Sequence, residues 1–351
     1  MNSAIDESAP PAEASATQGL DGSAARHAAT TRRVAAVLGL LMVAVLASLP
    51  AWAERSTQRT ATEFLYMLAL AQMWNLLAGY GGLLSVGQQA FVGLGAYSLV
   101  ALGLHAGLNA FVVVPLAGIV GAVAAVVVAP LVFRLRGAHF AVGTWVVAEV
   151  LRILVANMPF VSGGSGVSVA ATVSGMAVDV REAGTLWMAL ALGVGATLGV
   201  YALLRSRLGL ALVAVRDSER ASQSLGIDVQ RVKWLVWVAA AAGCAMTGAL
   251  IFTTKLRVSP DNAFSMDWST MMFFIVVIGG IGTLEGPILG ALVYFVLREW
   301  LSDLGGIYLI VLGLATMLVM LFAHGGLWGL VARRLNLQLF AVQRRVDEGG
   351  S

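Results

Sequence analysis

Apolar blocks long enough to cross a membrane recur along most of the chain, with polar segments between them. A helix needs about 20 mostly apolar residues to span the hydrocarbon core of a bilayer. The pattern therefore predicts an all-α polytopic membrane protein with about ten transmembrane helices. We expect these helices at residues 34–52, 63–80, 85–105, 110–133, 138–157, 185–204, 234–252, 269–282, 286–302 and 306–323.

The composition lies far from that of soluble proteins. Hydrophobic residues make up 59% of the 351 residues and charged residues only 12%, whereas about 25% of a typical soluble domain is charged. The single cysteine, Cys244, excludes an internal disulfide, and the sequence has no zinc-site spacing, catalytic triad or ATP-binding glycine-rich loop. We therefore expect a chain that is not an enzyme and that carries no metal and no cofactor.

The basic residues predict an orientation in the membrane, and we expect no nucleic-acid partner. With the N-terminus in the cytoplasm, 15 of the 22 Lys and Arg residues fall on the cytoplasmic side, as the positive-inside rule requires. An even number of spans then places the C-terminus there too. The expected domains are a disordered cytoplasmic tail at 1–33, a transmembrane domain at 34–330 and a cytoplasmic C-terminal tail at 331–351.

One apolar stretch, NLLAGYGGLLSVGQQAFVGLGAYSLVAL (75–102), is unusually rich in glycine and carries Asn75, Ser85, Gln88 and Gln89. Polar side chains persist inside a bilayer only where they face protein or a water-filled cavity. We predict that this cluster lines a solute pathway. For any one of these residues taken alone, the alternative is a hydrogen bond between helices.

A second glycine-rich block, GGIGTLEGPILGALVY (279–294), has a layout similar to that of GGLLSVGQQAFVGLGAY (81–97). Transporters are often built from internal repeats with interrupted segments at corresponding positions. An internal repeat is one interpretation, and chance similarity between glycine-rich helices is the other.

Glu149 and Arg152 form a second candidate site, because residues spaced i, i+3 are neighbours on one helix face. A charge within a membrane span is costly, so an adjacent opposite charge is the expected compensation. Two interpretations remain open. The pair either fixes the packing of helices or forms part of an outer mouth that meets a zwitterionic solute.

The polar segment 205–233 is longer than a connector needs to be and is amphipathic. Leu210, Val213 and Ala214 share one helical face, and Gly226 is placed to end a second short helix. Residues of both charges lie between them, at Arg216, Asp217, Glu219 and Arg220. A lipid-binding helix would carry mostly Lys and Arg on its polar face, so the mixed charge favours docking on a soluble protein.

Four blocks, in their order and spacing, resemble the permease subunits of branched-chain amino acid ABC transporters, closest to the LivM type. The resemblance covers about residues 35–330. The blocks are NLLAGYGGLLSVGQQAFVGLGAY (75–97), RLRGAHFAVGTWVVAEVLR (134–152), SRLGLALVAVRDSERASQSLGIDVQRVK (206–233) and IGGIGTLEGPILGA (278–291).

The resemblance implies an ABC importer permease fold in the bacterial inner membrane. It implies pairing with a second permease subunit of the LivH type, two cytoplasmic ATPase subunits that bind the ATP, and a periplasmic binding protein that delivers leucine, isoleucine or valine. The segment from Ala214 to Arg220 then corresponds to the part that rests on an ATPase subunit.

Three alternatives remain. The same family includes permeases for urea and short-chain amides, which the sequence does not separate from amino acid permeases. An ion-coupled secondary transporter would need carboxylates inside the membrane, for which Glu149 and Glu285 are the candidates. A purely structural membrane subunit would not need a polar cluster such as the one at 75–89.

The first apolar block generates a prediction about processing. Arg32 and Arg33, the apolar run that follows and Ala51-Trp52-Ala53 also fit a secretory signal with its cleavage site. We expect the block to remain as the first span, as in many polytopic proteins. The intact mass of protein extracted from membranes should therefore include residues 34–53, and a mature chain that starts at Glu54 would contradict this prediction.

Overall fold

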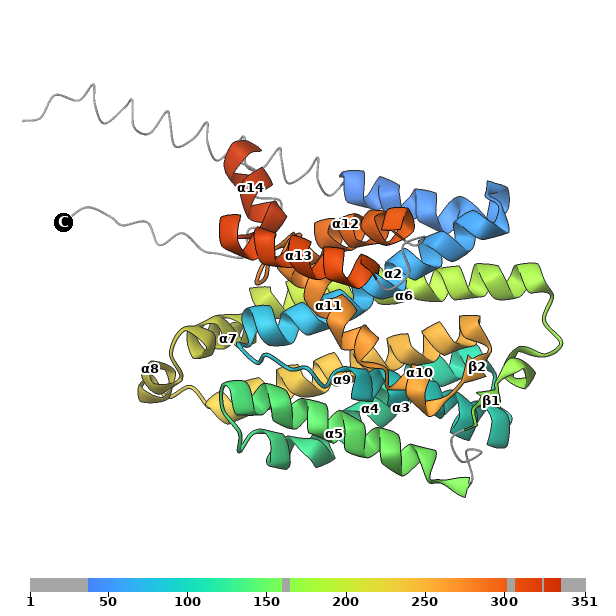
Figure 1. Cartoon of the computed structure of the whole chain (residues 1–351), viewed down its shortest axis with the longest axis horizontal. Helices are drawn as coiled ribbons and strands as arrows, with labels where there is room; N and C mark the ends of the chain where they lie inside the picture. Colours follow the sequence, from blue (N-terminus) through green and yellow to red (C-terminus); the bar gives the residue numbers. More distant parts are fainter. Residues whose placement is uncertain (1–36, 160–164, 302–306, 324, 336–351) are drawn as a thin grey trace, which may run out of the picture.

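The computed structural model describes residues 37–159, 165–301, 307–323 and 325–335, and most of them lie in helices (Figure 1). The first described helix is Val37–Trp52. The later helices are α2 (Arg55–Asn75), α3 (Gln89–Ser98), α4 (Ala110–Val132), α5 (Ala138–Ala156), α6 (Val178–Arg205), α7 (Arg207–Asp217), α8 (Glu219–Ser224), α9 (Val229–Lys255), α10 (Pro260–Ala263), α11 (Met266–Gly279), α12 (Gly286–Leu301), α13 (Ile307–Phe322) and α14 (Gly326–Leu335).

Two helices continue as π-helical turns, and one strand pair joins distant loops. The turn η1 (Leu76–Tyr80) extends α2, and η2 (Leu99–His105) extends α3. The strands β1 (Val167–Ser168) and β2 (Arg257–Val258) pair antiparallel, and a 3₁₀ turn, η4 (Ala170–Val173), follows β1. This pair lies at the end of the molecule opposite α7 and α8 (Figure 1).

Each of the ten predicted apolar ranges overlaps a helical segment. Within the described residues, five helices are long and apolar enough to cross a membrane, or six if α13 and α14 form one bent span. Two shorter apolar helices, Val37–Trp52 and Gln89–His105, add to them. The fold is therefore that of a multi-pass helical membrane protein, and the total of ten spans stays a prediction.

The predicted tail at 1–33 lies outside the described residues, and α14 continues past the predicted boundary at residue 330.

Helix α9 is the centre of the packing. It contacts α2, α3, α4 and α6, and 72% of its most apolar stretch is buried. The indole nitrogen of Trp237 donates a hydrogen bond to the carbonyl of Ala125 on α4 (3.1 Å). Around this indole lie the rings of Phe91, Phe133 and Phe140, each at an edge-to-face angle. A second group, α11 and α12, packs against α2.

Glycines set the closest helix contacts. A Cβ atom on Gly95 of α3 would lie 1.9 Å from the carbonyl oxygen of Ala245 on α9, and one on Gly248 of α9 would lie 2.2 Å from that of Val92 on α3. Halfway along α6, a Cβ on Gly193 would lie 3.0 Å from the carbonyl oxygen of Leu65 on α2. Small residues allow such approaches in membranes, where association depends on packing and not on escape from water.

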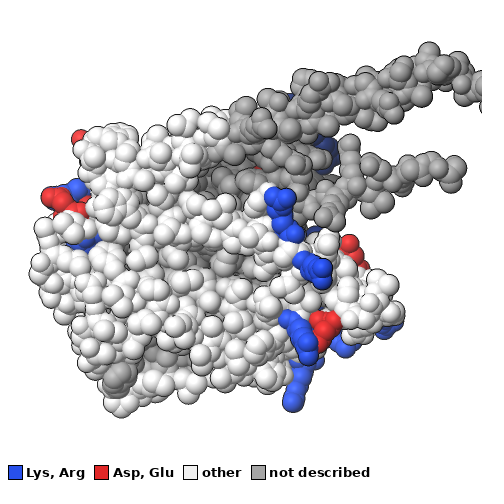
Figure 2. All heavy atoms as spheres, turned by 180° about the vertical axis from the view of Figure 1, so that it is seen from behind, with Lys and Arg blue, Asp and Glu red and all other residues white. Residues whose placement is uncertain are grey.

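The charged residues divide the surface into zones. Figure 2 shows Lys, Arg, Asp and Glu gathered at two opposite ends of one face, with a broad uncharged band between them. The segment α7–α9 contributes exposed Arg207, Arg220 and Arg231 at its end of the bundle. An uncharged band between two charged ends is the surface expected of a protein surrounded by hydrocarbon.

The α3–α9 contact generates a stability prediction. Gly95→Ala places a methyl group where the carbonyl of Ala245 lies, so the two helices must separate, at a cost of about 1–3 kcal/mol. We expect a lower thermal unfolding midpoint for the detergent-purified protein, followed by circular dichroism. The matched control is Gly195→Ala on α6, where an added Cβ meets nothing within 4 Å. Equal midpoints for both variants would show that the close contact is unimportant for stability.

Candidate functional site

Two interruptions of the helices meet inside the bundle. Helix α2 ends in the turn η1, and α11 is separated from α12 by a short turn at residues 280–285. The amide of Asn75 donates to the carbonyl of Thr283 (2.8 Å), and its oxygen accepts from the backbone N–H of Gly282 (2.9 Å). Gln72, one turn earlier on α2, donates to the carbonyl of Leu284 (3.0 Å). Two amide side chains of α2 thus satisfy the backbone of the second interruption.

Glycines are required at this junction. A Cβ atom on Gly79 would lie 2.5 Å from the backbone nitrogen of Gly282, and Gly282 has a φ of +75°, in the left-handed region. A larger residue at either position would push the two interruptions apart. The end of α2 and its turn η1, which precede the first glycine-rich block, are therefore in direct contact with the second block, 279–294.

The remaining residues of the predicted pathway are buried in the first interruption. Ser85 and Gln88 have no exposed surface, and Gln89 is 2% exposed. Gln88 donates to the hydroxyl of Ser85 (3.2 Å), while Gln89 accepts from the hydroxyl of Ser269 on α11. The structure thus places the side chains of Asn75 and Gln89 at contacts between segments and those of Ser85 and Gln88 in a local contact, and the role of all four in a pathway stays a prediction. The side-chain oxygen of Gln88 is buried without a partner.

Arg216 connects the predicted docking segment to these interruptions. It lies in the last turn of α7, and its guanidinium donates to the carbonyl of Gly79 (3.0 Å). A second contact joins it to Asp217 (3.2 Å). The Arg216 side chain is 36% exposed, so its predicted role at a partner stays a prediction. Its guanidinium also reaches the first interruption.

The rest of the docking segment is exposed. Leu212 and Val215 form the buried face of α7, which leaves Leu210 58% exposed. Helix α8 ends, as predicted, at a glycine, Gly226, with a φ of +80°. An ion pair between Glu219 and Lys233 ties α8 to α9. Of the other residues predicted for coupling, Ala214 is half-buried, and Asp217 and Arg220 are exposed.

The predicted ion pair between Glu149 and Arg152 is present and has a third member. Arg152 donates from Nε to both carboxylate oxygens of Glu149 (3.0 Å each), and its Nη1 donates to Asp261 on α10 (2.7 Å). The pair therefore joins α5 to α10. Its side chains are partly exposed, so the pair lies at the surface of the bundle.

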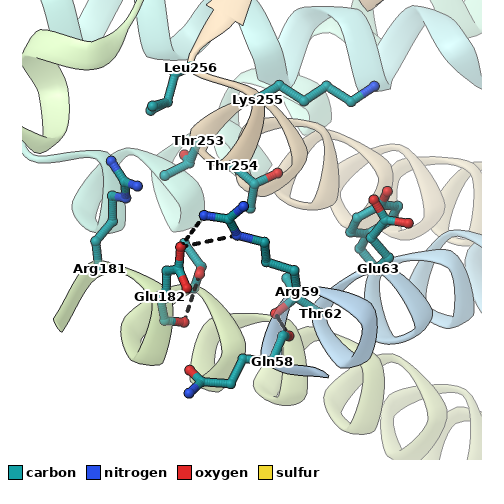
Figure 3. A pocket seen from close by; sticks show the side chains of 12 residues that line it. Gln58, Arg59, Thr62, Glu63, Arg181, Glu182, Thr253, Thr254, Lys255 and Leu256 are labelled. Atoms are coloured by element: carbon teal, nitrogen blue, oxygen red, sulfur yellow. Dashed lines mark hydrogen bonds and ion pairs between the residues drawn. The ribbon is translucent and has the colours of Figure 1, made fainter. Parts of the chain in front are cut away.

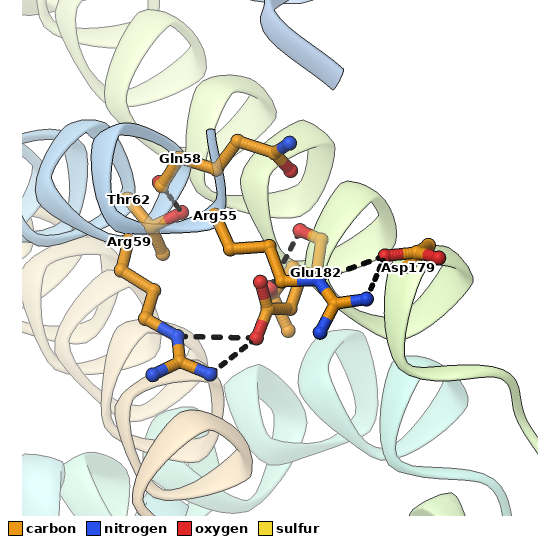
Figure 4. A network of polar contacts seen from close by, with 7 residues as sticks. Arg55, Gln58, Arg59, Thr62, Asp179 and Glu182 are labelled. Atoms are coloured by element: carbon orange, nitrogen blue, oxygen red, sulfur yellow. Dashed lines mark hydrogen bonds and ion pairs between the residues drawn. The ribbon is translucent and has the colours of Figure 1, made fainter. Parts of the chain in front are cut away.

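A polar cavity of about 300 Å³ lies at the far end of the bundle from α7, between the first turns of α2 and α6 and the end of α9 (Figure 3). Arg59 on α2 donates from Nε and Nη2 to the same oxygen of Glu182 on α6 (3.1 and 2.5 Å). Beside them Arg55 pairs with Asp179 (2.8 Å; Figure 4). Because an α-helix rises 1.5 Å per residue, the full length of α6 puts this cavity about 40 Å from α7.

The charged residues at the starts of α2 and α6 were not among the predicted site residues, although their spacing carries a signal for this cavity. Arg55 and Arg59 are spaced i, i+4 at the start of α2, and Asp179 and Glu182 are spaced i, i+3 at the start of α6. Each pair lies on one helix face, so the two faces carry opposite charges. Asp261 has no comparable signal, because it is 109 residues from Arg152.

Comparisons with known proteins agree with this architecture. The chain is 30% identical over 329 residues to the high-affinity branched-chain amino acid transport system permease protein LivM of Escherichia coli K12, covering 85% of this chain and 77% of that protein. It is also 30% identical over 336 residues to LivM of Salmonella typhimurium LT2, covering 88% and 78%. A probable LivM of Methanocaldococcus jannaschii is 24% identical over 153 residues, 44% of each chain.

No solved structure matches the chain. The sequence profile described as "Branched-chain amino acid transport system / permease component" matches residues 56–332, which include both helix interruptions, the α7–α8 segment and the polar cavity. The chain is therefore a multi-pass membrane protein that belongs to the family of permease components of branched-chain amino acid transport systems.

Proposed function

We propose that this chain is a membrane-spanning subunit of an ATP-driven importer that moves branched-chain or chemically related amino acids across the bacterial inner membrane. Its partners are a second permease subunit of the LivH type, two cytoplasmic ATPase subunits and a periplasmic solute-binding protein. Both termini and α7–α8 lie on the cytoplasmic side. The family and the LivM relatives support this assignment.

The hydrogen bond from Arg216 to the carbonyl of Gly79 is the observation that carries the proposal. An ATP-driven importer needs a mechanical connection between the ATPase and the solute pathway. Here one side chain joins an exposed cytoplasmic helix to the place where two membrane segments are interrupted. Movement of α7 would therefore act directly on backbone that is already outside a regular helix.

The exposed part of α7–α8 suits an ATPase subunit as partner. Leu210 is 58% exposed and Leu225, at the end of α8, is 79% exposed. They are close in sequence to the charged side chains of Asp217 and Arg220, which are also exposed. Apolar anchors surrounded by charges of both signs are typical of protein–protein interfaces.

The alternatives make different use of the same residues. A urea or short-chain amide permease of this family would keep the coupling segment and differ only in its solute. A secondary transporter would need Glu149 or Glu285 as an ion or proton site, and of these Glu149 already accepts three hydrogen bonds from Arg152. Because Arg152 stabilises the charged form of Glu149, this carboxylate is poorly suited to take up and release a proton during transport.

Reconstituted transport tests the proposal. In proteoliposomes with the second permease, the ATPase subunits and liganded binding protein, we expect ATP-dependent leucine uptake. Arg216→Ala removes the donor to Gly79, so uptake and solute-stimulated ATP hydrolysis should fall at least about tenfold, the size of effect expected for one charge-assisted hydrogen bond of about 1.5–3 kcal/mol. The ATPase subunits should remain bound, because the exposed apolar side chains of Leu210 and Leu225 on the docking surface are unchanged.

The matched control is Arg205→Ala, at the same end of the bundle, whose guanidinium contacts Tyr201 on its own helix. It should leave uptake near that of the unmodified complex. Normal uptake by the Arg216→Ala complex would show that the contact between Arg216 and Gly79 does not couple α7 to the helix interruptions. Uptake that needs an ion gradient and no ATP would instead favour a secondary transporter.

A further inference from the structure

The polar cavity between α2, α6 and α9 contains more positive than negative charge. Its lining includes the cations Arg59, Arg181 and Lys255 and the carboxylates Glu63 and Glu182. Arg59 is paired with Glu182, and Glu63 lies 3.4 Å from Arg298. Among the ion pairs of the described residues, none includes Arg181 or Lys255. Figure 3 shows these two cations on either side of the Arg59–Glu182 pair.

Glu182 has unused hydrogen-bonding capacity. Its side chain is 8% exposed, and both donors of Arg59 reach the same oxygen, Oε1. The other oxygen, Oε2, is buried and has no partner. A buried carboxylate oxygen without a donor is costly, and a ligand that brings an N–H donor would remove this cost.

Lys255 is held in place without being neutralised. Its ammonium lies 4.7 Å from the ring centre of Trp268 and 5.6 Å from that of Phe252. Such contacts orient a cation and leave its charge available to an anion. The next residue, Leu256, has a φ of +58° and ends α9 in the left-handed conformation. This turn fixes the cavity wall that carries the lysine.

The cavity also has an apolar part and a limited size. Tyr66 and Leu256 line it together with the charged groups. A volume of about 300 Å³ is at the small end of the range for ligand pockets, which suits one small molecule and not an oligopeptide.

We propose that this cavity is a transient binding site for a zwitterionic α-amino acid with an aliphatic side chain. Its ammonium group donates to Glu182, its carboxylate is attracted by the cations Arg181 and Lys255, and its side chain packs against Tyr66 and Leu256. The inference rests on the proposed function and narrows it, because urea and neutral amides carry neither charge. The proposed amino-acid site is on the permease itself, about 40 Å from α7, because the length of α6 separates the two.

The test measures occupancy without transport. Thr254, exposed at the cavity, is replaced by cysteine in a Cys244→Ala background, and the full complex in membrane vesicles without binding protein is treated with a small charged thiol reagent. Leucine should slow modification about threefold at twice its dissociation constant, as simple occupancy requires. 4-Methylpentanoate, which lacks the ammonium, and leucinamide, which lacks the carboxylate, should protect much less.

Variants separate binding in this cavity from binding elsewhere on the complex. Glu182→Gln, which can still accept from Arg59, and the double variant Arg181→Gln/Lys255→Met should each abolish protection. Arg55→Gln, which removes only the neighbouring exposed ion pair with Asp179, should retain it. A cysteine at Leu225, at the opposite end of the bundle, should react at the same rate with and without leucine.

Three results would overturn the inference. They are equal protection by 4-methylpentanoate, no protection by leucine, and full protection in both charge variants. If any of these occurs while the unmodified complex still shows ATP-dependent leucine uptake, only the binding site is wrong. If that complex shows no ATP-dependent uptake, the proposed function itself fails.

Discussion

Backbone groups that leave a helix inside a membrane must find hydrogen-bond partners within the protein, and this constraint organises the structure. The two interruptions after α2 and α11 leave carbonyl and N–H groups that no longer pair within a helix. Asn75 and Gln72 on α2 provide the partners for one of them. Because the donors come from the other half of the chain, the two interruptions cannot separate without losing these bonds. The chain can therefore have two interrupted helices side by side only because Gln72 and Asn75 supply these hydrogen bonds.

The same constraint explains how charge is distributed. Charged side chains are gathered at the two ends of the bundle (Figure 2), and three of the cations on the helices have a carboxylate or a carbonyl as their partner. Arg152 has Glu149 and Asp261, Arg59 has Glu182, and Arg216 has the Gly79 carbonyl. By contrast, no ion pair among the described residues includes Arg181 or Lys255, and both line one cavity. For that reason the cavity is of functional interest.

The hydrophobic pattern predicted where helices form, because apolar periodicity and length are local properties of the chain. Residue type and spacing predicted that α8 ends near Gly226 and that Glu149 pairs with Arg152, because both features depend on residues within a few positions of each other. They could not predict that Asn75 meets Thr283, or that Arg216 reaches Gly79, because these contacts depend on which helix faces meet across more than a hundred residues. The π-helical turn η1 had no signal beyond its single glycine, Gly79.

The position of Gly193 has a mechanical consequence. This residue lies near the middle of α6, where an added Cβ would be 3.0 Å from the carbonyl oxygen of Leu65 on α2, and α6 is a single uninterrupted helix from Val178 to Arg205. If α6 tilts by about 5° around that contact, each end, about 20 Å away along the helix axis, moves by about 2 Å, and the two ends move in opposite directions. Glu182 is near one end and α7 begins just beyond the other. The gap between α6 and α2 would then narrow beside the charged cavity and widen beside α7, without any bending of α6.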